Sequence, residues 1–303
     1  MATVLCVGIA ALDQVFRVDA MPSRPEKYRS DALHVTGGGT AANAAVAAAR
    51  LGATVRFYGV LGEDRTGDEI VAGLVAEDVD CGGIRRVAGR RSPLSAILVD
   101  PSGERLIVSY ADPELPWSTD HLPDALPAGL DGVLGDTRWQ AGSAHFFRLA
   151  RAAGIPAVLD ADRAPKDIPE LMGLATHVAF SHQGARDLTG EEDPSSALQM
   201  IGSRSSTWVA VTHGAKGVLH WRGREVVREP AFPVGAVDTL GAGDTWHGAF
   251  IVALAEGASE EDALRFASAA AALKCTRFGG RDGAPRRGEV HQLLTHGSGK
   301  DEA

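Results

Sequence analysis

The sequence predicts an α/β fold of three layers, in which helices cover both faces of a mostly parallel central sheet and a small β-sheet forms a lid. Two observations predict it. Short apolar runs alternate with helical segments along most of the chain, a pattern typical of parallel sheets covered on both faces. Pairs of strand-like segments interrupt this alternation at about residues 13–35 and 92–110. We therefore expect residues 1–303 to form one domain, with these two segments as its lid.

The alternation begins with a continuous apolar run, Val4–Ala10, which is bounded by polar residues as a buried strand would be. A helix of small residues, Gly39–Leu51, follows, and then the strand Val55–Leu61 and the helix Gly67–Glu77. The later predicted strands are Gly132–Asp136, Ala157–Asp160, His177–Phe180 and Trp208–Thr212. The later predicted helices are Gln140–Ala153, Gln183–Leu188, Asp244–Glu256 and Glu260–Leu273.

The lid is predicted from four strand-like segments. Asp13–Ala20 and Ala32–Val35 flank a polar, proline-containing loop, whereas Ser95–Asp100 and Arg105–Tyr110 flank Pro101-Ser-Gly-Glu104, a good hairpin signal. Such a sheet would cover the crevice at the C-terminal ends of the parallel strands, where ligands of α/β proteins bind. Because exposed sheet edges tend to pair, we also expect a homodimer formed through the lid.

Composition narrows the possible partners. Hydrophobic residues make up 45% of the chain and charged residues 23%, which is enough for a sizeable core. The net charge of −9 argues against nucleic acid or an anionic membrane as a partner. Cys6, Cys81 and Cys275 are far apart and predict neither a disulfide framework nor a zinc site. With no signal peptide and no apolar run of about 20 residues, we expect a cytoplasmic protein.

The most informative stretch is Asp238-Thr-Leu-Gly-Ala-Gly-Asp244, which precedes a predicted helix. Gly241, Ala242 and Gly243 are small enough for backbone N–H groups to approach an anion, and a helix N-terminus favours a phosphate there. Asp244 stands at this position to accept a proton from a hydroxyl that attacks phosphorus. The alternative is a glycine-containing turn in which an aspartate caps the helix.

A second stretch, Gly37-Gly-Gly-Thr-Ala-Ala-Asn43, opens another predicted helix. Consecutive glycines allow a polyhydroxy substrate to lie against the backbone, and Asn43 can both donate to and accept from hydroxyls. The alternative is a glycine-rich turn with a helix cap. The stretch lacks the Gly-Lys-Ser/Thr of a Walker A loop.

Taken in order, four motifs resemble the signatures of the ribokinase-like (PfkB) sugar kinases. They are Gly37–Asn43 with the helix to Gly52, Gly62–Gly67, Val211–Gly217 and Asp238–Asp244. The likeness runs from Val4 to about Gly283. It implies a ribokinase-like α/β/α sandwich with a β lid, ATP as phosphoryl donor and Mg²⁺ as cofactor.

The resemblance also implies roles for individual residues. Asp244 would be the catalytic base, with Gly241, Ala242 and Gly243 as the anion hole. The hydroxyls of the acceptor sugar would be bound by Asp13, Gly38, Gly39 and Asn43. The nucleotide would be bound by Ser181, Thr212, Gly214 and Gly217, with Ala271, Lys274 and Gly280 near the adenine or ribose.

One departure from the family concerns the metal. Family members usually carry an asparagine and, three residues later, a glutamate that organises the water shell of Mg²⁺, whereas this chain has Ser181 and Gly184. Either His182, Gln183 or Asp187 takes over, or phosphates and water hold the ion. The metal ligands are thus left unassigned.

Within the family, the chain resembles the bacterial 6-deoxy-6-sulfofructose kinases in stretches such as Glu26-Lys-Tyr28 and Asp136-Thr-Arg-Trp139. This likeness implies that Lys27 and Arg138, with Ser109 of the lid, bind the sulfonate. The alternative for Lys27 and Arg138 is a solvated surface charge. The histidines, including His247, show no metal-ligand spacing, and we interpret them as ordinary polar positions.

The sequence thus predicts ATP-dependent phosphorylation of a primary hydroxyl of a ketose, with an anionic sugar such as sulfofructose as the substrate. Kinases for fructose, fructose 6-phosphate, tagatose 6-phosphate or 2-keto-3-deoxygluconate are the nearest alternatives. A nucleoside kinase is disfavoured by the Lys27 and Arg138 pair. A non-catalytic sugar or nucleotide sensor on the same fold is disfavoured by Asp244, because a sensor needs no base beside an anion hole.

Overall fold

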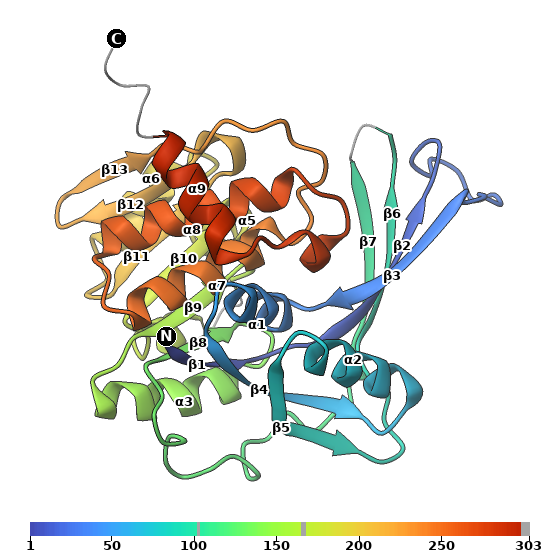
Figure 1. The fold of residues 1–303 in the computed structure, drawn as a ribbon, viewed down its shortest axis with the longest axis horizontal. Coiled ribbons are helices and arrows are strands. Elements are labelled where there is room, and N and C mark those ends of the chain that lie inside the picture. Colours follow the sequence, from blue (N-terminus) through green and yellow to red (C-terminus); the bar gives the residue numbers. More distant parts are fainter. Residues whose placement is uncertain (102–103, 165–167, 298–303) are drawn as a thin grey trace.

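A computed structural model describes residues 1–101, 104–164 and 168–297, and its centre is a nine-stranded sheet (Figure 1). The strand order is β13-β12-β11-β10-β9-β8-β1-β4-β5, and the neighbours from β11 to β5 are all parallel. The strands are β1 (Thr3–Val7), β4 (Thr54–Gly62), β5 (Val79–Val87), β8 (Gly132–Asp136), β9 (Ala157–Ala161), β10 (His177–Ser181), β11 (Trp208–Thr212), β12 (Val218–Arg222) and β13 (Glu225–Glu229).

The order of the strands reverses beside β1. The chain builds outward from β1 through β4 to β5, and it then crosses to β8, which pairs with the opposite edge of β1. Such a switch point leaves a crevice at the C-terminal ends of the strands, where ligands bind in open α/β sheets. The loops that follow β1 and β8 therefore meet at the crevice.

Helices cover the sheet on both faces. On one face lie α1 (Thr40–Arg50), α2 (Arg65–Val75), α7 (Ala242–Ala255), α8 (Glu260–Cys275) and α9 (Arg287–Gly297). On the other lie α3 (Gln140–Ala153), α4 (Ile168–Met172), α5 (His182–Thr189) and α6 (Pro194–Gly202). Single 3₁₀ turns, η1 (Gly214–Lys216) and η2 (Gly280–Gly283), lie in the connections.

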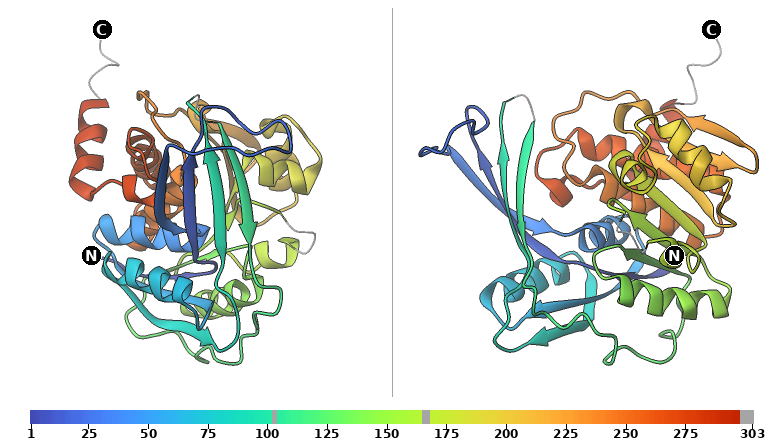
Figure 2. Two further views of the ribbon diagram at one scale, coloured as in Figure 1. Left: turned by 90° about the vertical axis from the view of Figure 1, so that its right-hand side faces the viewer. Right: turned by 180° about the vertical axis from the view of Figure 1, so that it is seen from behind.

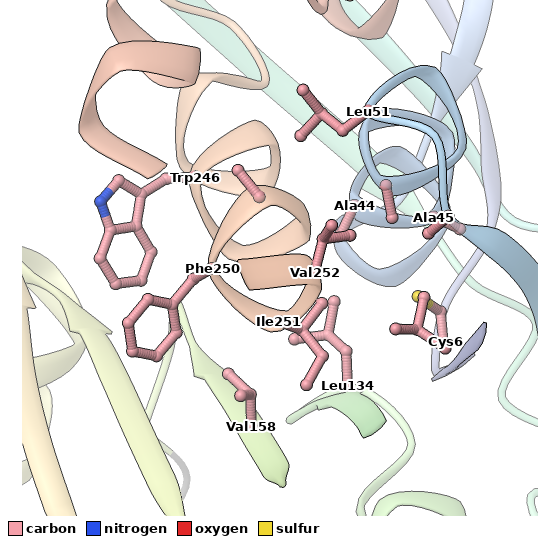
Figure 3. Close-up of a cluster of buried hydrophobic side chains, with 14 of the residues drawn as sticks. Cys6, Ala44, Ala45, Leu51, Leu134, Val158, Trp246, Phe250, Ile251 and Val252 are labelled. Atoms are coloured by element: carbon pink, nitrogen blue, oxygen red, sulfur yellow. The ribbon is translucent and has the colours of Figure 1, made fainter. Parts of the chain in front are cut away.

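Alternate residues of each strand face opposite helical layers, as the period of two requires. In β1, Val4 and Cys6 belong to the core beneath α1 and α7, whereas Leu5 and Val7 belong to the core beneath α3. Helix α7 carries the largest part of the first core. Its Phe250 and Ile251 point toward the strands, and Ala44 and Ala45 of α1 lie beside it (Figure 3). This packing fixes the N-terminus of α7 relative to the crevice.

A separate four-stranded sheet stands apart from this body (Figure 2). It consists of β2 (Ala11–Arg17), β3 (Ala32–Gly38), β6 (Leu94–Val99) and β7 (Arg105–Tyr110), in the order β3-β2-β6-β7. We call it the lid sheet. Its register places Thr36, Asp13, Ser95 and Ser109 in one row across the four strands. Because cross-strand neighbours share a face, this row is a polar stripe on one side of the lid sheet.

The opposite side of the lid sheet is apolar. The positions of β3 and β7 that alternate with the polar stripe carry large hydrophobic side chains, and between 39% and 62% of each residue is exposed. They are Leu33 (57%), Val35 (46%), Leu106 (39%), Val108 (62%) and Tyr110 (48%). We call these five residues the outer lid face.

The predicted α/β fold with a β lid is confirmed, and most of the predicted elements agree with the structure to within a few residues. Helix α7 begins at Ala242 and not at Asp244, and the first strand ends at Val7 and not at Ala10. The strands β5, β12 and β13 and the helices α4, α6 and α9 were not predicted. The turn predicted at Pro101-Ser-Gly-Glu104 includes Ser102 and Gly103, which lie outside the described residues.

Candidate active site

The anion-hole segment, Gly241–Gly243, forms the start of α7. Gly241 is the N-cap residue and has φ of 76°, a left-handed conformation that glycine adopts without strain. No side chain caps the helix, so the alternative in which Asp244 is the cap is wrong. The first N–H groups of an α-helix have no partner within the helix, and together with the helix dipole they favour an anion at this end.

Hydrogen bonds and an ion pair of Asp238 and Lys274 hold the loop that precedes this segment. Asp238 Oδ1 accepts from the amide of Leu240 at 2.8 Å, and its Oδ2 accepts from the amide of Gly279 at 3.0 Å. The fully buried Lys274 places its Nζ 2.8 Å from the carbonyl oxygen of Asp238 and 3.3 Å from Oδ2. Burial opposes ionisation of Asp238, but the Leu240 amide and the Lys274 ammonium outweigh it and lower the pKa. The loop is thus held by an internal ion pair.

Asp244 lies on the first turn of α7, where Asn43 of α1 meets it. The Nδ2 of Asn43 donates to Oδ2 of Asp244 at 2.7 Å, although 201 residues separate the two in sequence. Burial in the crevice and the charge of Asp160 raise the pKa of Asp244 to about 8. A general base is most effective when its pKa is close to the working pH, so this carboxyl is poised to exchange a proton. The Oδ1 of Asn43 is buried without a partner among the described residues, and a substrate hydroxyl would satisfy it.

The three glycines before α1 are required by close packing. A Cβ at Gly38 would lie 2.3 Å from the carboxyl of Asp13, and one at Gly39 would lie 2.5 Å from the carbonyl oxygen of Ile9. At Gly37 a Cβ would fall within the guanidinium of Arg281. Asp13 is 8% exposed, and burial raises its pKa, while a hydrogen bond from Ser95 lowers it. The glycines thus bring the carboxylate of Asp13 against the backbone that leads into α1.

A cavity of about 490 Å³ lies on the other side of the anion-hole segment. Its lining includes Thr212, Gly214, Gly217 and Ala271, four of the predicted nucleotide-binding residues, together with Ala242 and Gly243. Lys274 and Gly280 are not among its lining residues. The ammonium of Lys274 instead braces the anion-hole loop, so the structure does not support a contact of this side chain with the adenine or ribose.

Ser181 is held away from the cavity by its role as a helix cap. Its Oγ accepts from the amide of Gly184 at 2.8 Å and donates to the carbonyl of Asp162 at 2.7 Å. A Cβ at Gly184 would lie 2.1 Å from the carbonyl oxygen of Ala161. No side chain, and so no glutamate, fits there without a shift of backbone.

The described residues contain no group of three or more His, Cys, Asp or Glu side chains that could hold a metal ion. The proposed substitutes already have protein partners. His182 contacts the carbonyl oxygen of Glu192, and Gln183 and Asp187 bond to each other at 2.6 Å. Mg²⁺ commonly keeps several waters and binds through substrate phosphates. The donor set therefore fits an ion that is held by phosphates and water better than one in a protein cage.

Asp136, at the C-terminal end of β8, places Arg138 beside the crevice. Its Oδ2 accepts from the amide of Ile9 and the hydroxyl of Thr40, both at the entrance to α1, and its Oδ1 accepts from the amide of Arg138 at 2.9 Å. The guanidinium of Arg138 lies 3.4 Å from Oδ2 of Asp162, and both side chains are nearly half exposed. An exposed pair of this kind is weak, so the guanidinium is available to another anion.

The other two residues predicted to bind the sulfonate come from the lid segments. Ser109 lies in the polar stripe with its Oγ 3.4 Å from that of Ser95, which is itself paired with Asp13 in the register. Lys27 is exposed in the loop between β2 and β3. Among the described residues, no contact joins Lys27, Ser109 and Arg138.

Sequence reasoning missed several residues that build the site. Asp136 and Asp238 were part of recognised motifs, but their role as hydrogen-bond hubs needs the fold. Asp160 was not singled out, and His247 was interpreted as an ordinary polar position, although both side chains are buried. The sequence signal for both residues was their position: Asp160 ends a predicted strand, and His247 follows Asp244 by three residues.

No helix among the described residues is long and apolar enough to cross a membrane. Residues 1–287 match the family described as pfkB family carbohydrate kinase. The chain is 32% identical to ribokinase of Bacillus subtilis over 97% of its own length and all of the relative's.

Solved structures agree with this match. A provisionally named ribokinase of Agrobacterium tumefaciens superposes with a TM-score of 0.93 at 39% identity, covering 99% of both chains. Ribokinase of Arabidopsis thaliana, solved with ribose and ATP, superposes with a TM-score of 0.81 at 26% identity over 97% of this chain and 99% of that one. The chain belongs to the pfkB family of carbohydrate kinases and is an ATP-dependent sugar kinase.

Proposed function

We propose that residues 1–303 act as one kinase domain that transfers the γ-phosphoryl group of ATP to a primary hydroxyl of a ketose with an anionic end. The specific substrate that we propose is 6-deoxy-6-sulfofructose, phosphorylated at its C1 hydroxyl. The observation that carries the reaction type is the contact of Asn43 with Asp244 at the N-terminus of α7. Asp244 follows Ala242 and Gly243, which line the cavity that suits a nucleotide, and Asn43 lies on the helix that begins just after Gly38, against which the carboxylate of Asp13 packs.

In this mechanism Asp244 accepts the proton of the attacking hydroxyl, while Asn43 holds the carboxylate in place and offers its free Oδ1 to the sugar. The amides of Gly241–Gly243 meet the negative charge that develops on the transferred phosphoryl group. The lid sheet, with Asp13 on its inner stripe, closes over the sugar and excludes water that would otherwise hydrolyse ATP. Mg²⁺ bound with ATP would neutralise part of the phosphate charge.

Arg138 supports the anionic end of the substrate. Asp136 fixes its backbone next to the entrance of α1, so its guanidinium is near the crevice, and within the described part of the chain Asp162 is its one ion-pair partner. A guanidinium fork suits a tetrahedral anion with three acceptor oxygens. Ser109, from the same stripe as Asp13, supplies a hydroxyl for a further oxygen. Lys27 would add a second cation when the lid closes.

Ribose is the second candidate, because the named relatives of comparable length are ribokinases. It has a primary hydroxyl but no anion, so the two proposals differ in their dependence on Arg138. We would measure kcat/KM with ATP and Mg²⁺ for sulfofructose, fructose 6-phosphate, fructose and ribose, in wild type and Arg138→Ala. Preference for sulfofructose that falls selectively in the variant supports the proposal. If ribose or fructose is the best wild-type substrate, the anionic-substrate proposal is wrong.

We further propose that two copies associate through the outer lid face. Its five apolar side chains come from both edge strands of one sheet, and exposed contiguous apolar surface of this kind marks an interaction site. A second copy presents the same surface, as a two-fold symmetric interface requires.

A further inference from the structure

A buried acid–base pair lies directly beneath the site and has no role in the mechanism described above. His247 follows Gly243 by one helical turn in α7, and Asp160 lies in β9. Their side chains are 4% and 3% exposed, and Nδ1 of His247 lies 3.4 Å from Oδ2 of Asp160. Burying two ionisable groups is costly in free energy unless each provides the other with a hydrogen-bond or charge partner. Their position beside the catalytic segment therefore points to a function.

The ring nitrogens of His247 face more acceptors than a neutral imidazole can satisfy. Nδ1 lies 2.9 Å from the carbonyl oxygen of Gly243, and Nε2 lies 3.2 Å from that of Ala179 in β10. A neutral imidazole carries one N–H, which leaves one ring nitrogen opposite an oxygen. An imidazolium beside a carboxylate avoids this conflict, because Nε2 then donates to the carbonyl of Ala179 and Nδ1 donates to the carbonyl of Gly243 beside the Asp160 carboxylate. In this state the pair holds one titratable proton.

The pair therefore carries no net charge, and this affects how readily the neighbouring Asp244 ionises. Burial raises the pKa of Asp160 well above its ordinary value and lowers that of His247. Each group alone therefore resists its charge, and the two charges are tolerated only together, as the hydrogen-bond geometry of the ring requires. The other charged groups around the pair are Asp244 on α7, Asp162 just after β9, and Asp136 and Arg138 at the end of β8. Of these four, three are acidic, so an additional buried negative charge would oppose ionisation of Asp244.

We propose that His247 and Asp160 are positioning residues that share one proton at the start of α7, keep the pair without net charge, and hold the Gly243–Asp244 peptide in the orientation needed for phosphoryl transfer. The carbonyl of Gly243 and the N–H of Asp244 belong to the same peptide group. A contact of His247 with that carbonyl therefore fixes the direction in which the N–H points. The proposal rests on the proposed function of Asp244 as the base.

The pH profile of kcat/KM separates this role from simple packing. His247→Gln removes the imidazolium that balances the Asp160 carboxylate, so the uncompensated negative charge should move the profile to higher pH. A shift of one unit would lower kcat/KM about tenfold at neutral pH while leaving its alkaline plateau unchanged. Adding Asp160→Asn to His247→Gln should restore the wild-type position, because the asparagine side chain cannot ionise. His177→Gln, at a buried histidine that contacts Trp208 and Phe250, is the matched control and should not move the profile.

Two outcomes would overturn the proposal: an equal loss of kcat/KM at every pH in His247→Gln, or the same alkaline shift when Asp160→Asn is also present. A second measurement does not depend on turnover or on the folding of the variants. In full-length wild type with ¹⁵N-labelled histidine, the ring nitrogens of His247 should keep one protonation state between about pH 6 and 9, and an ordinary titration near about 6.5 would refute the shared proton. If the wild type phosphorylates no sugar, the proposed function fails while the NMR measurement still decides the pair.

Discussion

Replacing Asp244 with asparagine should have two effects that can be measured separately, a loss of turnover and a gain in stability at alkaline pH. The substitution keeps the size of the side chain, and its amide oxygen can still accept from Nδ2 of Asn43. It removes the proton acceptor, so kcat should fall by roughly 10²–10⁴, the usual contribution of a general base. Affinity for ATP should change little, because the cavity that suits the nucleotide is lined by other residues.

The same substitution should make the protein more stable at alkaline pH. The pKa of Asp244 rises from 3.8 to about 8 on folding. The unfolded chain therefore releases this proton at lower pH than the native state does, and the wild-type free energy of unfolding falls as pH rises from about 4 to 8. The full shift corresponds to up to about 6 kcal/mol. With an unfolding entropy of about 2.1 cal/mol/K per residue, this is up to about 9 °C in Tm for a chain of 303 residues.

The assay is thermal unfolding of wild type and Asp244→Asn from pH 4 to pH 8.5, with turnover measured on the same samples. The two proteins should have similar Tm values near pH 4, and the variant should become progressively more stable as the pH rises. A constant difference in Tm across the range would refute the elevated pKa. A variant that retains most of its turnover would refute the assignment of Asp244 as the base.

Four further results are expected. Arg138→Ala should lower kcat/KM for an anionic ketose by a factor equivalent to about 1.5–3 kcal/mol of lost binding free energy, and Asp162→Asn should raise kcat/KM. Equal effects of these substitutions on neutral fructose would contradict the anion pocket. Ser181→Ala should cost about 1 kcal/mol of stability as a lost helix cap with modest loss of turnover, while a chelator should abolish turnover. Activity that survives the chelator would exclude the metal. Val108→Asp should convert a dimer to a monomer in analytical ultracentrifugation, and a monomeric wild type at micromolar concentration would exclude the lid interface. Lys274→Met should destabilise the protein by about 3–5 kcal/mol, because it leaves Asp238 as an unpaired, partly buried charge, and unchanged denaturant unfolding would argue against the brace.

The sequence by itself determined the class of fold and the reaction. Continuous apolar runs such as Val4–Ala10 and Trp208–Thr212 favour buried strands, and their alternation with helices favours a covered parallel sheet. The heptapeptide Asp238–Asp244 predicted an anion hole at a helix N-terminus, because small residues and a carboxylate were adjacent along the chain. These features are local, and local features can be recognised without coordinates. Edge elements such as β5, whose sequence has two glycines and two arginines, lacked a clear pattern and were missed.

Only the tertiary structure decided which distant groups meet. Asn43 reaches Asp244 because α1 packs against α7, and Arg138 stands at the crevice because Asp136 bonds to both its amide and the entrance of α1. Lys274, predicted to lie near the nucleotide, turned inward because the carboxylate of Asp238 and nearby carbonyls offered a buried ammonium its partners.

The register of the lid sheet likewise could not be deduced from its strands one at a time. A shift of one residue would exchange the polar stripe of Asp13 for the apolar outer lid face. Hydrogen bonds and ion pairs between segments far apart in the chain depend on distances that only packing sets. The residue types therefore indicated the chemistry, whereas the fold decided which of them carry it out.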